Sequence, residues 1–113
     1  MSGVYGNENL AFVGGSQYLT VDGTSDTVTL PVNVDAVDLY GTTDMWVVVG
    51  NPGETPTAAA PGAEKTSIIG FFLPSGETRT VAVPRAKDDS PVKIAAIQDS
   101  AGGTLHVTYR RLS

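Results

Sequence analysis

Alternation of apolar and polar residues along the chain predicts a series of short β-strands, because side chains of a half-buried strand point in turn to the core and to solvent. The segment Met45–Val49 is apolar throughout, which is typical of a strand covered on both faces. The predicted strands are Gln17–Val21, Thr27–Leu30, Val37–Tyr40, Met45–Val49, Thr66–Leu73, Thr78–Val83, Val92–Gln98 and Thr104–Arg110.

Glycine, proline and short polar residues separate these strands and predict tight turns. Three segments are predicted to be β-hairpins: one around Asp22–Asp26, a central one over Asp35–Gly50 (DAVDLYGTTDMWVVVG) and a closing one around Asp99–Gly103. The sequences TVTLP and TVAVP, each followed by a connection, a strand, a glycine-containing turn and a strand, form a weak repeat. We therefore predict an all-β, single-domain antiparallel β-sandwich with Greek-key or jelly-roll-like connections.

Two segments of the chain, one N-terminal and one internal, have compositions unlike those of the predicted strands. Residues 1–16 are rich in glycine and contain scattered apolar residues, which predicts an extended N-terminal arm before a sandwich domain at residues 17–113. Such an arm either adds to the sheet edge of a neighbouring molecule or is a frayed terminus. Asn51–Glu64 contains three prolines and predicts a long surface loop suited to contact with a partner.

In the predicted strand Thr66–Leu73, Gly70 is expected to mark a bulge or a close approach of two backbones.

Composition excludes several classes of protein. The 113 residues include no cysteine, which excludes a disulfide scaffold and thiolate metal sites. The N-terminal residues do not have the pattern of a secretion signal, and no apolar run reaches membrane-spanning length, so no membrane partner is expected. A net charge of −5 makes nucleic-acid binding unfavourable.

The charge is unevenly placed along the chain. Residues 1–64 contain acidic residues and no Lys or Arg, whereas all seven basic residues lie from Lys65 onward. The acidic and basic halves either meet between copies in a head-to-tail contact, or are interleaved by the folding of the sandwich. Both interpretations are open at this level.

Candidate chemistry is sparse, and we find no catalytic, cofactor-binding or metal-binding motif. Trp46 lies in the wholly apolar strand and is expected to anchor the core, with stacking on a sugar or a partner as the alternative. His106 is the only histidine and alternates with Leu105 and Val107, so it is expected on the outer face, at the surface or an interface. The aspartates lack the spacing of a calcium loop and are expected to form turns and to keep the surface soluble.

Several segments together carry a family resemblance: the strand ending in TVTLP, the DLYGTTDMWVVVG segment, an Ala/Pro/Gly-rich loop, the LPSGET turn and the terminal IAAIQDSAGGTLHVTYRR segment. Their order from Tyr18 to Tyr109 resembles small structural proteins of tailed bacteriophages. The resemblance implies a non-enzymatic virion protein that decorates or cements the capsid surface after assembly in the host cytoplasm. It also implies binding to the major capsid protein as a homo-oligomer, with a trimer favoured, and no cofactor.

The expected capsid contacts lie in the arm, in the proline-rich loop and at the C-terminal arginines. The residues predicted to bind partners are Tyr5, Leu10, Phe12, Pro56, Pro61, Arg110 and Arg111. The alternative function is a carbohydrate- or receptor-binding module of a phage fibre or spike, which requires exposed aromatic side chains. The candidates for that role are Tyr40, Tyr109 and Trp46.

Overall fold

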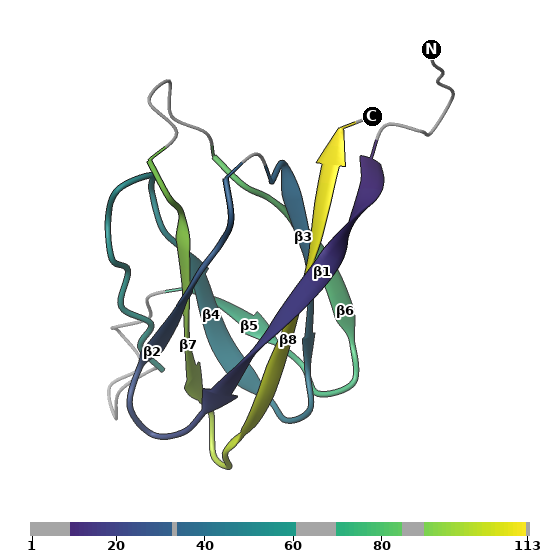
Figure 1. The fold of residues 1–113 in the computed structure, drawn as a ribbon. Helices are drawn as coiled ribbons and strands as arrows, with labels where there is room; N and C mark the ends of the chain where they lie inside the picture. Colours follow the sequence, from purple (N-terminus) through teal and green to yellow (C-terminus); the bar gives the residue numbers. More distant parts are fainter. Residues whose placement is uncertain (1–9, 33, 61–69, 85–89, 113) are drawn as a thin grey trace.

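The computed structural model describes residues 10–32, 34–60, 70–84 and 90–112. These residues form an all-β sandwich of two four-stranded antiparallel sheets, packed face to face (Figure 1). The strands are β1 (Leu10–Val21), β2 (Asp26–Thr29), β3 (Ala36–Gly41), β4 (Met45–Val49), β5 (Phe71–Leu73), β6 (Thr78–Ala82), β7 (Lys93–Gln98) and β8 (Gly103–Leu112). The predicted sandwich is confirmed.

The two sheets have the strand orders β1-β8-β3-β6 and β2-β7-β4-β5. The strands pair in a nested way, first with last and inward to the middle: β1 with β8, β2 with β7, β3 with β6 and β4 with β5. Further ladders join β3 to β8 and β4 to β7 and complete each sheet. This arrangement is the jelly roll, an eight-stranded antiparallel hairpin rolled into two sheets.

The three predicted hairpins are wrong in their pairing. β1 and β2 lie in different sheets, as do β3 and β4, and β7 and β8. The turns between them therefore carry the chain from one sheet to the other. Asp35–Gly50 is not a central hairpin but a strand of each sheet joined at a corner of the sandwich. A tight turn and two alternating strands look the same in sequence whether the strands pair with each other or cross between layers.

The first strand also begins earlier than the sequence pattern indicates. Leu10–Val21 pairs with β8 from Leu10 onward, so residues 10–16 of the predicted arm belong to the sheet. The register shifts between Phe12 and Ser16, and this irregularity spans the Gly14-Gly15 pair that made the segment unlike a strand in sequence. Residues 1–9 of the arm, and Thr66–Ile69 of the fifth predicted strand, lie outside the described residues.

The core fills the space between the sheets with aliphatic side chains. Val37 and Leu39 of β3, and Leu105 and Val107 of β8, are fully buried and face β4 and β7 across the sandwich. The remaining core residues are Val21, Val28, Leu30, Val34, Met45, Val47, Leu73, Val83, Val92, Ile94, Ala96 and Tyr109. Each sheet therefore has one face in this core and one face that points away from it.

Candidate interaction surface

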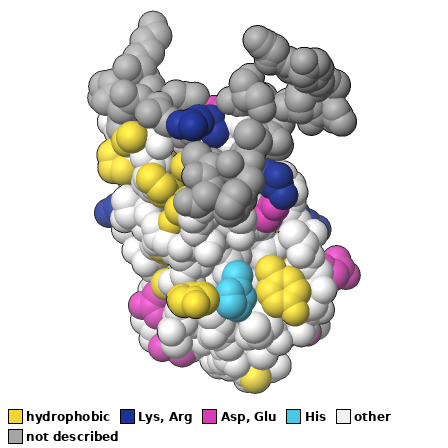
Figure 2. Space-filling view, turned by 45° about the vertical axis from the view of Figure 1, so that its right-hand side comes forward, with side chains coloured by type: hydrophobic (Ala, Val, Ile, Leu, Met, Phe, Trp, Pro, Cys, Tyr) yellow, Lys and Arg dark blue, Asp and Glu magenta, His cyan; other side chains and the backbone are white. Residues whose placement is uncertain are grey.

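A row of aromatic side chains crosses the outer face of the β1-β8-β3-β6 sheet. The strand registers place Tyr18 beside His106, His106 beside Tyr40, and Tyr40 beside Thr78. We call Tyr18, His106, Tyr40 and Thr78 the tyrosine row. Figure 2 shows the histidine between hydrophobic side chains on this face. The prediction that His106 points away from the core is confirmed, since its neighbours Leu105 and Val107 are fully buried.

The rings of the tyrosine row contact one another without covering the tyrosines. Tyr18 meets His106 edge-on, with ring centroids 5.2 Å apart and an interplanar angle of 81°. Tyr40 lies 5.9 Å from His106 at a tilt of 55°. Tyr18 remains 72% exposed and Tyr40 39% exposed. Large aromatic surface held in place by neighbouring rings on a sheet is suited to contact with a partner.

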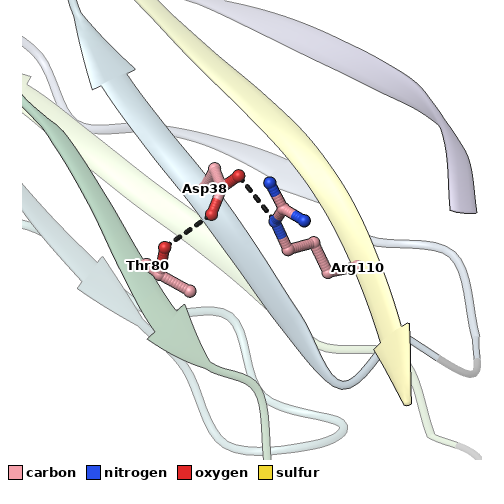
Figure 3. Close-up of polar contacts among 3 residues, drawn as sticks. All are labelled: Asp38, Thr80 and Arg110. Carbon is pink, nitrogen blue, oxygen red and sulfur yellow. Dashed lines mark hydrogen bonds and ion pairs between the residues drawn. The ribbon is translucent and has the colours of Figure 1, made fainter. Parts of the chain in front are cut away.

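The carboxylate of Asp38 links three strands of this sheet through an ion pair and a hydrogen bond (Figure 3). The Arg110 Nε of β8 donates to Asp38 Oδ2 of β3 at 2.7 Å, and the Thr80 hydroxyl of β6 donates to Asp38 Oδ1 at 2.6 Å. The side chains of Arg110 and Asp38 are 35% and 15% exposed. The shared carboxylate therefore connects β3 to both of its neighbours, β6 and β8. The positive charge of Arg110 compensates the negative charge of Asp38 on this face.

The outer face of the other sheet is partly covered. The described part of the proline-rich loop lies against the sandwich: the Ala58 N–H donates to Ser25 Oγ at 2.9 Å, and Lys93 Nζ donates to Thr55 Oγ1 at 3.1 Å. Ala95 points outward from β7 yet is fully buried, so that part of the sheet is covered rather than open to solvent.

Trp46 lies on this outer face, and the prediction that it anchors the core is wrong. Its side chain is half-buried, its Nε1 donates to Asp99 Oδ1 at 3.0 Å, and its ring lies 5.2 Å from that of Phe72 at a tilt of 54°. Phe72 is itself 36% exposed. A large ring with a polar N–H can cover a sheet face while keeping its donor at the surface, which the apolar run alone did not reveal.

Of the two tyrosines that were candidates for the alternative function, Tyr40 lies at the surface and Tyr109 lies in the core. Tyr109 is only 7% exposed and belongs to the core, so it is not the exposed ring that the alternative function required. Burial raises the pKa of its phenol, and a hydrogen bond with Gln17 acts in the opposite direction. Tyr18 was not among the candidates, although the alternation of Leu19 and Val21 toward the core was a signal that its ring points outward.

The residues predicted to bind a partner are spread over the fold. Tyr5 and Pro61 lie outside the described residues, whereas Leu10 and Phe12 stand in β1 opposite Leu112 and Arg110. The partner-binding role of the whole set stays a prediction. Pro56 is half-buried against Gly50, Arg110 pairs with Asp38, and Arg111 is exposed opposite Ala11.

Within the described segments, no group of three or more His, Asp or Glu side chains could hold a metal ion. No helix in the described part of the chain is long and apolar enough to span a bilayer. Compared with known proteins, the chain matches no family model, no curated protein and no solved structure. The exposed surface of the sandwich is therefore the basis on which a function can be assigned.

Proposed function

We propose that the chain is a non-enzymatic structural protein of a bacteriophage virion that binds and stabilises the capsid lattice as a decoration or cement protein. The observation that carries the proposal is the tyrosine row, which presents exposed aromatic surface on the face of a hydrogen-bonded sheet. The jelly-roll fold is compatible with this role but does not select it, because viral capsid proteins, lectins and cupins share that architecture. The phage resemblance of the sequence directs the choice among them.

The character of the face supports a protein partner. Threonine and serine surround the tyrosine row, and the one acidic side chain of the adjacent row, Asp38, is neutralised by Arg110. Interfaces between proteins are depleted of unpaired charge and enriched in tyrosine at their centres. A rigid, nearly neutral face also loses little conformational entropy when it docks.

The test measures binding to empty capsid shells of the phage whose genome encodes the chain, by co-sedimentation. Tyr40→Ser is expected to weaken binding at least about tenfold, as expected for loss of a central aromatic contact. Phe72→Ser is the matched control, because Phe72 is 36% exposed against 39% for Tyr40 but lies on the opposite sheet. The proposal fails when the unchanged chain does not bind shells, or when both variants bind as it does.

A second candidate function is a carbohydrate- or receptor-binding module of a phage fibre or spike. The observation that favours it is the pair of exposed tyrosine rings on either side of His106, bordered by hydroxyl groups that can hydrogen-bond to a sugar. Titration with a panel of oligosaccharides, followed by NMR shifts of the His106 ring, tests this candidate. Shifts that saturate, and that disappear in Tyr18→Ser, would favour it over capsid binding.

A further inference from the structure

β1 differs from the other edge strands of the two sheets. The ends of the two strand orders are β1 and β6 in one sheet, and β2 and β5 in the other. β2 and β5 have only 4 and 3 residues, and β6 carries Arg79. β1 has 12 residues, LAFVGGSQYLTV, with no charge and no proline. Proteins normally protect long sheet edges with charge, proline or a cover, because the free backbone groups pair readily with another strand.

At 72%, Tyr18 is the most exposed large hydrophobic side chain among those whose burial the structure describes. It stands near the middle of the regular segment Ser16–Val21, whose pairing with β8 continues without interruption. Ser16 and Thr20, which flank it on the same outer face, are also exposed. Among the described residues, a long sheet edge without charge or proline and an exposed aromatic ring therefore coincide in one segment.

We propose that two copies of the chain join through β1, antiparallel and with Tyr18 on the two-fold axis, to form one continuous eight-stranded sheet. In this register Tyr18 lies opposite Tyr18 of the second copy, and Ser16 lies opposite Thr20 of the second copy. Directly opposite residues of an antiparallel pair point to the same face. The two tyrosine rows then meet at the axis and form one aromatic stripe across both copies.

The chemistry of the strand favours a second copy as the occupant. The chain has a net charge of −5, yet Ser16–Val21 contributes no charge, so this is a segment at which two copies can meet without juxtaposed like charges. A two-fold contact makes each favourable interaction twice. It pairs the edge backbone groups of the two strands and buries the two Tyr18 rings against each other.

The proposed pairing does not depend on capsid binding, and it predicts a different number of copies in the oligomer from the one that the resemblance implies. A two-fold contact through β1 gives a dimer, whereas the resemblance implies a trimer. Light scattering of the unchanged chain, measured over a range of concentrations, distinguishes them. A dimer supports the proposal, and a monomer or a trimer overturns it. Capsid binding by a monomer would leave the proposed function standing and remove only the β1 pairing.

Cysteine cross-linking tests the position of the axis, because the natural chain has no cysteine. Opposite residues at an antiparallel junction have Cα atoms about 4.5–5.5 Å apart, within the range of a disulfide. Tyr18→Cys is expected to form a covalent dimer under mild oxidation, reversed by reductant. Tyr40→Cys is the matched control on the same face and is expected to remain uncross-linked. Equal cross-linking of the two variants overturns the register.

Charge substitutions test the register by a second route that does not depend on disulfide geometry. The double variant Ser16→Lys/Thr20→Lys places like charges opposite each other and is expected to raise the dimer dissociation constant at least about tenfold. Ser16→Lys/Thr20→Glu places opposite charges together and is expected to remain dimeric. Both positions are exposed, so both variants should fold. Equal dissociation of the two variants, or a monomer whose β1 amides resist hydrogen exchange because its own chain covers them, would refute the pairing.

Discussion

At the residue scale, Asp38 shows how a polar side chain on a sheet face can be structural. The alternation of β3 indicated that it points away from Val37 and Leu39, and the structure agrees. What the sequence did not show is that its two oxygens are used by residues far along the chain, Thr80 and Arg110. Such partners depend on which strands become neighbours, and strand order is not encoded in local periodicity.

We expect Asp38→Ala to lower the free energy of unfolding by about 1–2 kcal/mol, because the charge-assisted bond to Arg110 is lost and Thr80 loses its acceptor. Arg110→Ala should cost less, since its side chain is 35% exposed. A double-mutant cycle measured by urea unfolding should give a coupling energy of about 0.5–1 kcal/mol. Additive single effects would show that the ion pair contributes nothing to stability.

Tyr109 should make the protein sensitive to alkali. Its phenol has a pKa raised above the usual value of 10.0, with burial as the main cause. The unfolded chain therefore releases this proton first as pH rises. The stabilising contribution is fully present below about pH 10 and is lost as the pH approaches the folded-state value. Tyr109→Phe should reduce the loss of stability above pH 10, measured as the urea midpoint at each pH.

The same substitution should cost about 1 kcal/mol at neutral pH, because the hydrogen bond with Gln17 is removed while the ring stays in the core. A variant that loses stability above pH 10 as steeply as the unchanged chain would contradict the assignment of that loss to Tyr109.

At the element scale, the sequence predicted where the strands lie better than how they pair. Each of the eight predicted strands overlaps an observed strand; the largest difference is at β1, which begins at Leu10 rather than Gln17. The pairing was wrong at all three predicted hairpins because a sandwich corner uses the same short polar turn as a hairpin. The TVTLP and TVAVP repeat, by contrast, corresponds to β2 and β6, which occupy equivalent positions in opposite sheets.

Surface chemistry was harder to predict than the fold. Alternation placed His106 on the outer face, and it could have placed Tyr18 there too. That these side chains and Tyr40 form a single row depends on β8 lying between β1 and β3. Trp46 was misplaced for a related reason: an apolar strand suggests cover on both faces, but the number of layers around a sheet is a property of the assembled fold.

A comparison of Gly70 with Gly76 separates two ways in which replacing a glycine destabilises the fold, backbone strain and steric overlap of the added Cβ. Its φ of +116° is unfavourable for other residues, and an added Cβ would collide with the backbone carbonyl of Val47, which confirms the predicted close approach. Gly76 also has a positive φ, +82°, but nothing lies within 4 Å of its added Cβ. Gly76→Ala should therefore cost about 1–2 kcal/mol, from backbone conformation alone.

Gly70→Ala should cost at least about 1 kcal/mol more than Gly76→Ala, because overpacking adds to the backbone strain. Thermal or urea unfolding of the two variants gives the comparison. Equal losses would mean that the chain around Val47 shifts to accept the methyl group at no measurable cost.

At the scale of the whole molecule, the jelly roll mixes the two halves of the chain. Each sheet takes two strands from the acidic half and two from the half that holds all the basic residues. The ion pair between Asp38 and Arg110 joins the halves within one sheet. The fold thus favours interleaving of the charges over a head-to-tail contact between an acidic and a basic surface, and directs attention to the neutral β1 edge instead.

The nested pairing of strands also predicts the order in which strand pairs form during folding. β4 and β5 are consecutive along the chain, whereas β1 and β8 join its two ends, so the outermost pair must close the longest loop. Contacts that close long loops tend to form after the transition state when shorter-range pairings are available. We therefore expect β4 to be structured early in folding and β1 late.

Two matched substitutions test this order. Val21 of β1 and Val47 of β4 are both essentially fully buried, and Val→Ala at either should cost about 1–3 kcal/mol. In stopped-flow refolding and unfolding, Val47→Ala should mainly slow folding, with a φ-value of roughly 0.5 or more, while Val21→Ala should mainly speed unfolding, with a φ-value near zero. Equal φ-values would place the closure of β1 onto β8 in the transition state, and the edge proposed for pairing with a second copy would then form together with the core rather than after it.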